Sequence, residues 1–355
     1  MIGKHIAELD ALRFFGNVLV VGIHIMIPVK LIDGGVEYGI WHWISQCFCG
    51  MALPLLFFIS GYVVGNKMEG YWVRLGKRFK RLVLPFVGWN FIYASSFLIM
   101  CMIGLMKPAH ANLSSATSIL LFFAEKVFPI VSPPGDMPLW YLRAIFVFSL
   151  AYPILSWLLD MRGGVVWLKG LLSFGTVCLW GVVESRPGMK EFLQYTYPCY
   201  AILAFMVGFA VSRNGVPIDL LWTRYKWPAF IVGLLAVFLV PHFGIDLVIF
   251  KSSMRIVSLF VLVPFVPGIL RLYRRIPVCV TESAFFIYAM HLLVLVGFSA
   301  VSPFILDSVK YGGVTVVVVS GFALSIILPT LILRLLQGSS MSFVRFAGRV
   351  LNGRM

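Results

Sequence analysis

Arg13 and His24 lie inside the first long apolar stretch of the chain, residues 9–29. On an α-helix, eleven residues make three turns plus about 20°, so both side chains point the same way, about 16 Å apart along the axis. Asp10 and Asn17 lie one turn before and one turn after Arg13 on that side. Ionisable groups in an apolar span are costly and tend to face a protein interior or a water-filled path. We therefore expect the chemistry of this protein on this polar stripe, with Arg13 and His24 as its central pair.

The stripe suggests two kinds of chemistry. A guanidinium can stabilise an anion in a site of low dielectric constant, and an imidazole with an unperturbed pKa near 6.5 can move a proton. An alternative for Arg13 is that its long side chain reaches the lipid headgroups, which the short imidazole of His24 cannot do. Asp10 can pair with Arg13 and fix its orientation.

The connection between the second and third apolar stretches, residues 66–81, is the most basic part of the chain. Lys77, Arg78 and Arg81 are our candidates there for binding the phosphates of a cytosolic polyanion such as coenzyme A. Attraction to anionic lipid headgroups is the alternative, and it accounts for part of this charge.

Three further polar residues interrupt apolar stretches and are supporting members of the candidate site. His291 lies in the middle of a stretch, with Tyr288 one turn before it on a similar face. A histidine so deep needs a hydrogen-bond partner or a wet cavity, so a catalytic role and a purely structural role both fit it. Ser60, followed by Gly61, is typical of a position where two membrane helices approach closely.

Several kinds of site are missing from the sequence. It holds no G-x-S-x-G elbow, P-loop, H-E-x-x-H motif or dinucleotide fingerprint. The six cysteines form no CxxC pair and no Cys/His cluster with zinc-ligand spacing, so we interpret them as small packing residues and expect no metal. Arg143 and Arg255 are further cations near the predicted outer surface, where they either contact substrate or anchor to headgroups.

Composition indicates an all-α, polytopic membrane helix bundle, a single domain over residues 1–355. Of the residues, 60% are apolar and 12% charged, mean hydropathy is +0.95, and apolar runs of about twenty residues recur throughout. We predict about ten transmembrane helices, at residues 9–29, 43–64, 82–104, 138–159, 165–183, 196–212, 228–243, 247–269, 284–302 and 313–336.

The net charge of +15 follows this topology. Most lysines and arginines fall in alternate connections, on the side that includes both chain ends, as the positive-inside rule requires of cytoplasmic segments. We therefore predict that both termini are cytoplasmic. The basicity is explained by topology, and we expect no nucleic-acid partner.

These segments, in this order, resemble the acyltransferase 3 family of membrane O-acyltransferases. The matching segments are Glu8-Leu-Asp-Ala-Leu-Arg13 with His24, Pro54-Leu-Leu-Phe-Phe-Ile-Ser-Gly-Tyr62, Lys77-Arg-Phe-Lys-Arg-Leu-Val-Leu-Pro85, Pro138-Leu-Trp-Tyr-Leu142 with Tyr152-Pro153, and Ile287-Tyr-Ala-Met-His291. Each is short, but five in register cover most of the chain. The departures are Lys77 and Lys80 among the arginines, and Arg143 where the family is usually apolar.

The resemblance implies transfer of an acyl group, usually acetyl, from acyl-CoA (acetyl-CoA as co-substrate) to a hydroxyl of a saccharide or glycolipid acceptor of the cell envelope. It implies a multi-pass protein of the bacterial cytoplasmic (inner) membrane, surrounded by lipid, and a stand-alone form without a fused esterase-like domain. Arg13 and His24 match the family's essential pair. His24 then acts as a general base or carries the acyl group itself. The resemblance does not decide whether the protein forms a homodimer.

Two other classes of protein are alternatives to an acyltransferase. Polar stripes, mid-span histidines and Pro-broken helices also suit a transporter of protons or of a lipid-linked saccharide, although no inverted repeat is detectable. A lipid-binding scaffold is the third. Release of free coenzyme A from acyl-CoA in the presence of acceptor distinguishes an acyltransferase from both.

Overall fold

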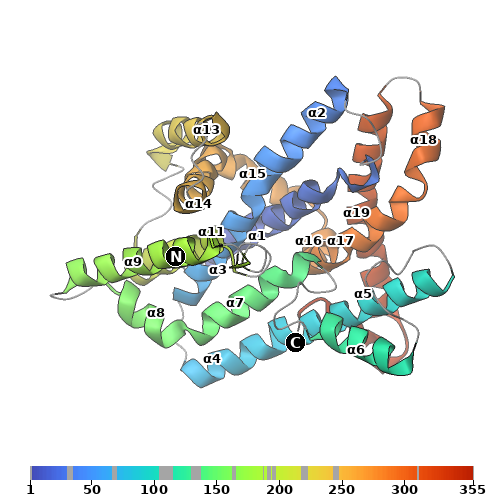
Figure 1. The fold of residues 1–355 in the computed structure, drawn as a ribbon, viewed down its shortest axis with the longest axis horizontal. Coiled ribbons are helices and arrows are strands. Elements are labelled where there is room, and N and C mark those ends of the chain that lie inside the picture. The colour runs from blue at the N-terminus through green and yellow to red at the C-terminus, as the bar shows by residue number, and fades with distance from the viewer. Residues whose placement is uncertain are drawn as a thin grey trace.

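The computed structural model describes residues 2–29, 35–65, 70–103, 115–128, 137–161, 165–186, 188–189, 193, 197–216, 223–242, 248–309 and 312–354. Within these ranges the chain is helical and contains no strand, which confirms the all-α prediction (Figure 1). The helices are α1 Ile2–His24, α2 Val36–Trp43, α3 Ala52–Gly65, α4 Tyr71–Arg78, α5 Leu84–Met102, α6 Ala116–Val127, α7 Trp140–Leu150, α8 Tyr152–Leu159, α9 Val166–Glu184, α11 Cys199–Arg213, α13 Lys226–His242, α14 Val248–Val257, α15 Val266–Arg275, α16 Val278–Glu282, α17 Ala284–Ser299, α18 Ser302–Ser308, α19 Gly313–Gly338 and α20 Ser342–Leu351.

Short 3-10 and π segments join some of these helices into longer rods. In the described chain, six such rods are long and apolar enough to cross a membrane, and there are eight if two bent pairs each count as one span. The bent pairs are α7 with α8, at 68°, and α17 with α18, at 53°. Each of the ten predicted spans coincides with a helix, but α11 and the described part of α13 are too short to qualify. The multi-pass character is therefore confirmed, whereas the number ten is not.

The basic segment before the third span is a helix, where the sequence suggested a connection up to Arg81. From Tyr71 the chain is helical through α4, a π segment at Phe79–Val83 and α5, so that Tyr71–Met102 forms one rod of 32 residues. Lysine and arginine are good helix formers, and their spacing leaves one side of α4 facing the protein. Arg74 is on that side and only 4% exposed. Residues 66–69 lie outside the described ranges.

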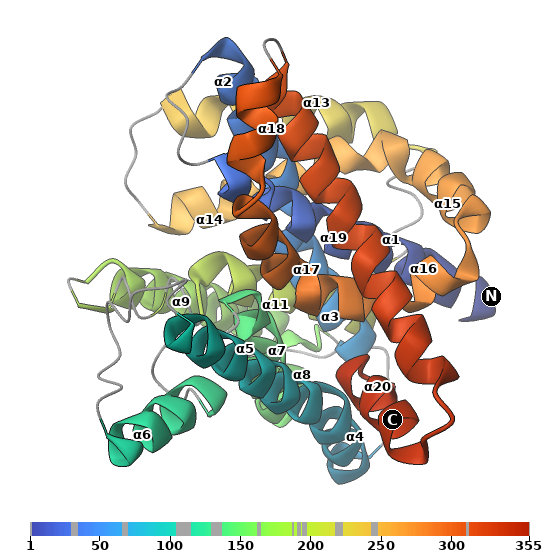
Figure 2. The same ribbon diagram turned by 90° about the vertical axis from the view of Figure 1, so that its right-hand side faces the viewer.

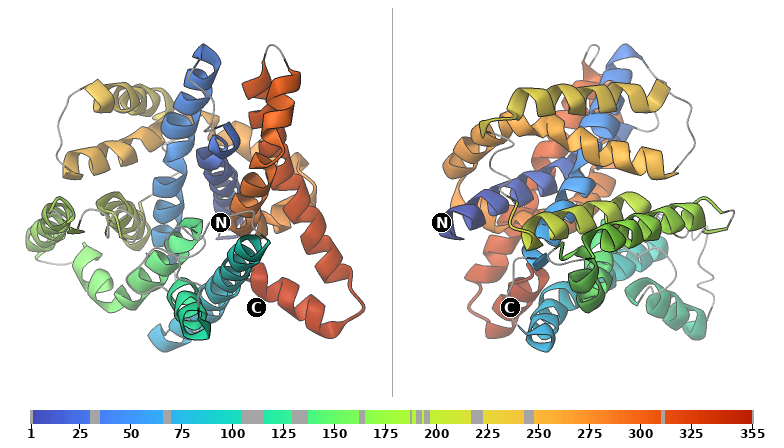
Figure 3. Two further views of the ribbon diagram at one scale, coloured as in Figure 1. Left: turned by 45° about the vertical axis from the view of Figure 1, so that its right-hand side comes forward. Right: turned by 90° about the vertical axis from the view of Figure 1, so that its left-hand side faces the viewer.

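Helix α1 runs through the interior of the bundle, between α3 and α17 (Figures 2 and 3). Its packing follows the polar stripe, because Asn17 is buried and donates from Nδ2 to the backbone oxygen of Ala284, at the start of α17, over 3.3 Å. The marked ends of the chain lie toward the same part of the molecule (Figure 2). Asn17 thus faces the protein interior, whereas the side chains of Asp10 and Arg13 stay about half exposed.

Helices α3 and α11 cross with their backbones in contact. A Cβ built on Gly61 would lie 2.0 Å from the carbonyl oxygen of Phe205, and one built on Gly208 would lie 2.0 Å from the carbonyl oxygen of Phe58. Both distances are far inside van der Waals contact, so only glycine fits at either position. The close approach predicted from the Ser60-Gly61 pair is confirmed, and α11 is the partner helix.

Gly61→Ala is expected to prevent normal folding. The added methyl group would meet a backbone oxygen that cannot move without displacing α11, at a cost of about 3 kcal/mol, the upper end for overpacking. The measurement is the yield of monodisperse protein in detergent and its thermal unfolding midpoint. Gly170→Ala is the control, because a Cβ on Gly170 of α9 meets nothing within 4 Å. A Gly61→Ala protein with wild-type yield and midpoint would contradict this account of the crossing.

Candidate active site

A cavity of about 670 Å³ lies where α1, α3, α4, α7 and α17 meet the turn after α20. It collects all of the predicted site residues except His24 and His291. The predicted residues on its wall are Asp10, Arg13, Asn17, Ser60, Lys77, Arg78, Arg81 and Tyr288. The structure therefore brings the polar stripe of α1 and the basic segment of α4 to one site.

The cavity wall is strongly cationic. Six basic side chains face two carboxylates, an excess of four positive charges: Arg13, Arg74, Lys77, Arg78, Arg81 and Arg354 against Asp10 and Glu282. A concave site of one sign raises the local concentration of oppositely charged ligands. This cavity is therefore suited to a ligand that carries several negative charges.

Arg13 is oriented by its neighbour on α1 but stays reachable. Its Nη1 lies 3.3 Å from Oδ1 of Asp10, and the two side chains are 42% and 48% exposed. An ion pair at such exposure contributes about 1 kcal/mol or less. A ligand phosphate that forms two parallel hydrogen bonds to the guanidinium can therefore compete with Asp10 for it.

The two arginines on the inner side of α4 are held more firmly. Nη1 of Arg78 donates to Oγ of Ser149 over 2.6 Å, and that hydroxyl donates to the carbonyl oxygen of Ile145 over 2.6 Å. The guanidinium of Arg74 lies 3.9 Å from the centre of the Tyr152 ring, a cation–π arrangement. Both charges are thus fixed in place before any ligand binds.

Hydroxyl groups form the side of the cavity next to α3. Oγ of Ser60 lies 2.9 Å from the hydroxyl of Tyr141, which donates to the carbonyl oxygen of Leu56 over 3.2 Å. Because the phenol uses its single proton on Leu56, Ser60 is the donor in the first contact. Ser60 therefore both permits the glycine crossing beside it and positions Tyr141 on the cavity wall.

Asn17 and Tyr288 line the part of the cavity closest to the two histidines. Both are buried, and the hydroxyl of Tyr288 donates to the carbonyl oxygen of Pro138. His24 lies seven residues after Asn17, two helical turns or about 10 Å further along α1. His291 lies three residues after Tyr288 on α17. Asn17 and Tyr288 are thus the cavity-lining residues that lie nearest in the chain to the two histidines.

His24 and His291 form a pair between α1 and α17. Their ring centres are 5.3 Å apart and the rings are inclined by 37°. His291 is completely buried, and its Nδ1 lies 2.6 Å from the carbonyl oxygen of Tyr288. A carbonyl only accepts, so Nδ1 carries the proton and Nε2 is left as an acceptor. Within the described chain Nε2 has no hydrogen-bond partner, so this acceptor is open to a proton donor between the helices.

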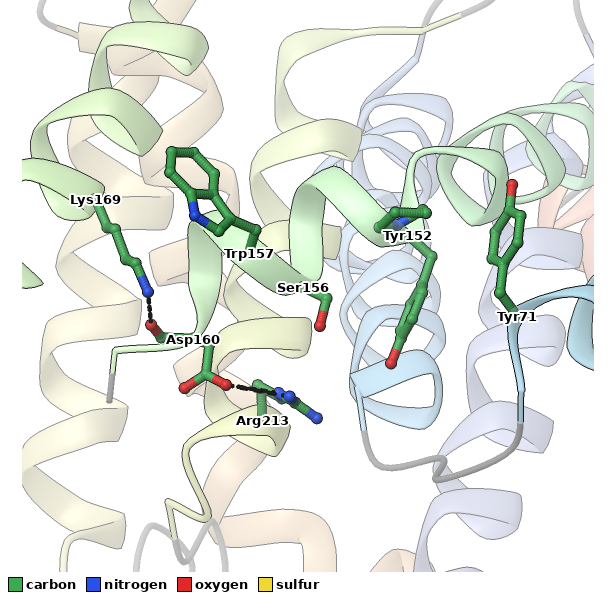
Figure 4. A pocket seen from close by; sticks show the side chains of 8 residues that line it. Tyr71, Tyr152, Ser156, Trp157, Asp160, Lys169 and Arg213 are labelled. Carbon is green, nitrogen blue, oxygen red and sulfur yellow. Dashed lines mark hydrogen bonds and ion pairs between the residues drawn. The ribbon is translucent and has the colours of Figure 1, made fainter. Parts of the chain in front are cut away.

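A second cavity, of about 460 Å³, lies between α4, α8, α9 and α11 (Figure 4). Here both cations are already engaged by the protein, and one of them is paired with a carboxylate. Oδ2 of Asp160 is 3.1 Å from Nη2 of Arg213, and Nζ of Lys169 donates to the carbonyl oxygen of Asp160 over 2.8 Å. The aromatic rings of Tyr71 and Tyr152 line the other side. Its excess of positive charge is therefore one, against four in the first cavity.

The remaining candidates lie away from the first cavity. Arg143 stacks over the ring of Tyr197, with 5.7 Å to the ring centre, and Arg255 lies 5.0 Å from the centre of Tyr200. The six cysteines are free thiols. Among the residues that the structure describes, no group of three or more His, Cys, Asp or Glu side chains could hold a metal ion.

Comparison with known families shows which family the chain belongs to. Residues 6–334 match the family model Acyl_transf_3, Acyltransferase domain, which covers nearly the whole chain. The chain belongs to this acyltransferase 3 family. Neither the curated proteins nor the solved structures include a match to it.

Several residues on the cavity wall were not predicted as site residues, among them Arg74, Asn352 and Arg354. In the sequence, Arg74 contributed only to the excess of basic residues in the predicted cytoplasmic segments. Asn352 and Arg354 belong to no recognisable motif. A partial signal existed for Arg74, which is three residues before Lys77 and four before Arg78 and so lies on a similar face of α4. No sequence signal connects Asn352 or Arg354 to α1, because their position depends entirely on how α20 packs.

Proposed function

We propose that this acyltransferase transfers an acyl group, acetyl above all, from cytoplasmic acyl-CoA to a hydroxyl of a cell-envelope saccharide or glycolipid in the bacterial inner membrane. One observation carries the proposal. A cavity with an excess of four positive charges is lined by Asn17 and Tyr288, on the same two helices that bring the imidazoles of His24 and His291 together. Family membership supports the reaction class.

In this proposal the phosphates of the donor bind at Lys77, Arg78 and Arg81. The fixed guanidinium of Arg78 offers the planar, two-pronged geometry that suits a phosphate. Beside it, the exposed Lys77 supplies a compact ammonium charge and the exposed Arg81 a second guanidinium. Arg13 lies on the same wall and binds the next polar part of the donor. The thioester then extends along α1 toward His24, about 16 Å from Arg13.

The chemical step is an attack by the acceptor oxygen on the thioester carbonyl. His24 accepts the hydroxyl proton as the new C–O bond forms, the C–S bond breaks, and the proton passes to the departing thiolate of coenzyme A. General-base catalysis of this kind contributes roughly 10²–10⁴-fold. In the rival mechanism a nitrogen of His24 attacks the thioester carbonyl, the C–S bond breaks and coenzyme A leaves as its thiol. The acceptor oxygen then attacks the acyl-histidine, which regenerates the imidazole.

The test uses the purified protein in liposomes with acetyl-CoA labelled in the acetyl group and a total extract of envelope lipids and glycans. We expect free thiol to appear together with label in the extract. Label bound to the protein after incubation without acceptor would select the acyl-histidine mechanism. Absence of thiol release, with saccharide or proton flux across the liposome instead, would support the transporter and contradict this proposal.

A further inference from the structure

The turn that follows α20 forms part of the cavity wall. Asn352, Gly353 and Arg354 line the cavity together with the stripe of α1 and the basic face of α4. These residues lie beyond residue 334, where the match to the family model ends. This wall is therefore a feature of the present chain that family membership does not explain.

The turn is fastened to the bundle. Nε1 of Trp89, which is 2% exposed, donates to the carbonyl oxygen of Leu351 over 2.9 Å, and Nδ2 of Asn352 donates to the carbonyl oxygen of Glu282 over 3.0 Å. Chain ends are usually poorly ordered unless they are tied down in this way. The turn is thus a fixed surface of the cavity, on which ligand-binding groups can be placed accurately.

Asn352 presents an acceptor that the protein does not use. The residue is 3% exposed, and its Oδ1 is buried without a hydrogen-bond partner in the described chain. Leaving a buried acceptor unsatisfied destabilises the protein, because the atom has lost its water and gained no partner. A ligand with an N–H group at this wall of the cavity would remove that cost when it binds.

Arg354 presents a positive charge that is weakly engaged. Its Nη1 lies 3.0 Å from Oε1 of Glu282, and the two side chains are 48% and 47% exposed. A pair this exposed contributes little to stability, because water and salt screen it. A doubly charged phosphate in the cationic cavity would form a stronger, charge-assisted contact, so Arg354 can exchange its carboxylate partner for a ligand.

We infer that Asn352 and Arg354 close the donor site and bind the polar end of the acyl donor, Arg354 a phosphate and Asn352 a neighbouring N–H group. This inference rests on the proposed function, because it takes acyl-CoA as the donor. It adds a binding wall that no part of the family motifs contains. It also gives Glu282 a role, because its carboxylate holds Arg354 until the donor displaces it.

The test measures binding of coenzyme A to the purified full-length protein by calorimetry, with inorganic pyrophosphate as a second ligand. Arg354→Gln is expected to weaken both ligands about tenfold, which corresponds to about 1.4 kcal/mol. Asn352→Ala is expected to weaken coenzyme A several-fold but to leave pyrophosphate unchanged, because pyrophosphate has no N–H group. Elution as a monodisperse peak and an unchanged unfolding midpoint establish that each variant is folded.

Two further variants separate binding from structure. Arg349→Gln removes the same charge from an exposed position of α20 that is not on the cavity wall, and it should bind coenzyme A as the wild type does. Glu282→Gln should strengthen binding about threefold, whereas a purely structural role of the pair predicts weaker binding. If Arg354→Gln binds both ligands as tightly as Arg349→Gln does, the inference is wrong. If the wild type binds no coenzyme A, the proposed function fails instead.

Discussion

His24→Ala is expected to lower the rate of acyl transfer by at least about a hundredfold while the affinity for coenzyme A stays within about twofold. The loss is that of a general base, which supplies roughly 10²–10⁴-fold, or of the acyl carrier in the rival mechanism. Binding is spared because His24 lies beyond Asn17 and Tyr288 and is not on the cationic wall. The measurement pairs the rate of thiol release with calorimetric binding of coenzyme A.

The matched control is His42→Ala. His42 is an exposed histidine on α2 that stacks on Tyr38, with 5.9 Å between ring centres, and it is not part of the cavity. We expect its removal to leave transfer unchanged. Thiol release by His24→Ala at a rate close to that of His42→Ala would refute the role of His24 in either mechanism.

Arg13→Gln is expected to reduce kcat/KM for acyl-CoA about a hundredfold, chiefly through KM. A hydrogen bond to a charged group contributes about 1.5–3 kcal/mol, and 2.7 kcal/mol corresponds to a hundredfold change. The substitution also leaves Asp10 without the cation 3.3 Å away, so a carboxylate then repels the phosphates. Steady-state kinetics over a range of acyl-CoA concentrations separate KM from kcat.

The repulsion makes a second expectation possible. Asp10→Asn combined with Arg13→Gln should recover part of the lost affinity, because the uncompensated carboxylate is gone. Arg274→Gln is the control, since Arg274 is an exposed arginine of α15 away from the cavity. A double variant as weak as the single one, or a single variant no weaker than Arg274→Gln, would show that Arg13 does not contact the donor.

The parts of the site that lie on one helix could be predicted from the sequence. The 3.6-residue period alone places Arg13 and Asn17 on one side of α1, and both line the cavity. The same local rule applies to the basic face of α4 and to Ser60 beside Gly61. Each of these predictions depends on residues within a few turns of one another, where backbone geometry decides the outcome.

The parts that depend on packing could not be predicted. Asn352 reaches the cavity only because Trp89 holds the carbonyl oxygen of Leu351, a contact across 262 positions of the chain. His24 meets His291 only because α1 packs against α17. The count of spans was uncertain for a related reason. A helix such as α11, largely covered by its neighbours, need not be long enough to match the width of the bilayer.

The glycine crossing of α3 and α11 also limits how the donor can enter and leave. Because Gly61 and Gly208 each lie against an opposing backbone carbonyl group, α3 cannot slide or tilt relative to α11. The side of the cavity that carries the hydroxyl groups is therefore rigid. Any widening of the cavity during a catalytic cycle must therefore come from its other walls. There the half-exposed Arg354–Glu282 and Arg13–Asp10 side-chain pairs can separate at little cost, while the backbone of the turn after α20 stays in place.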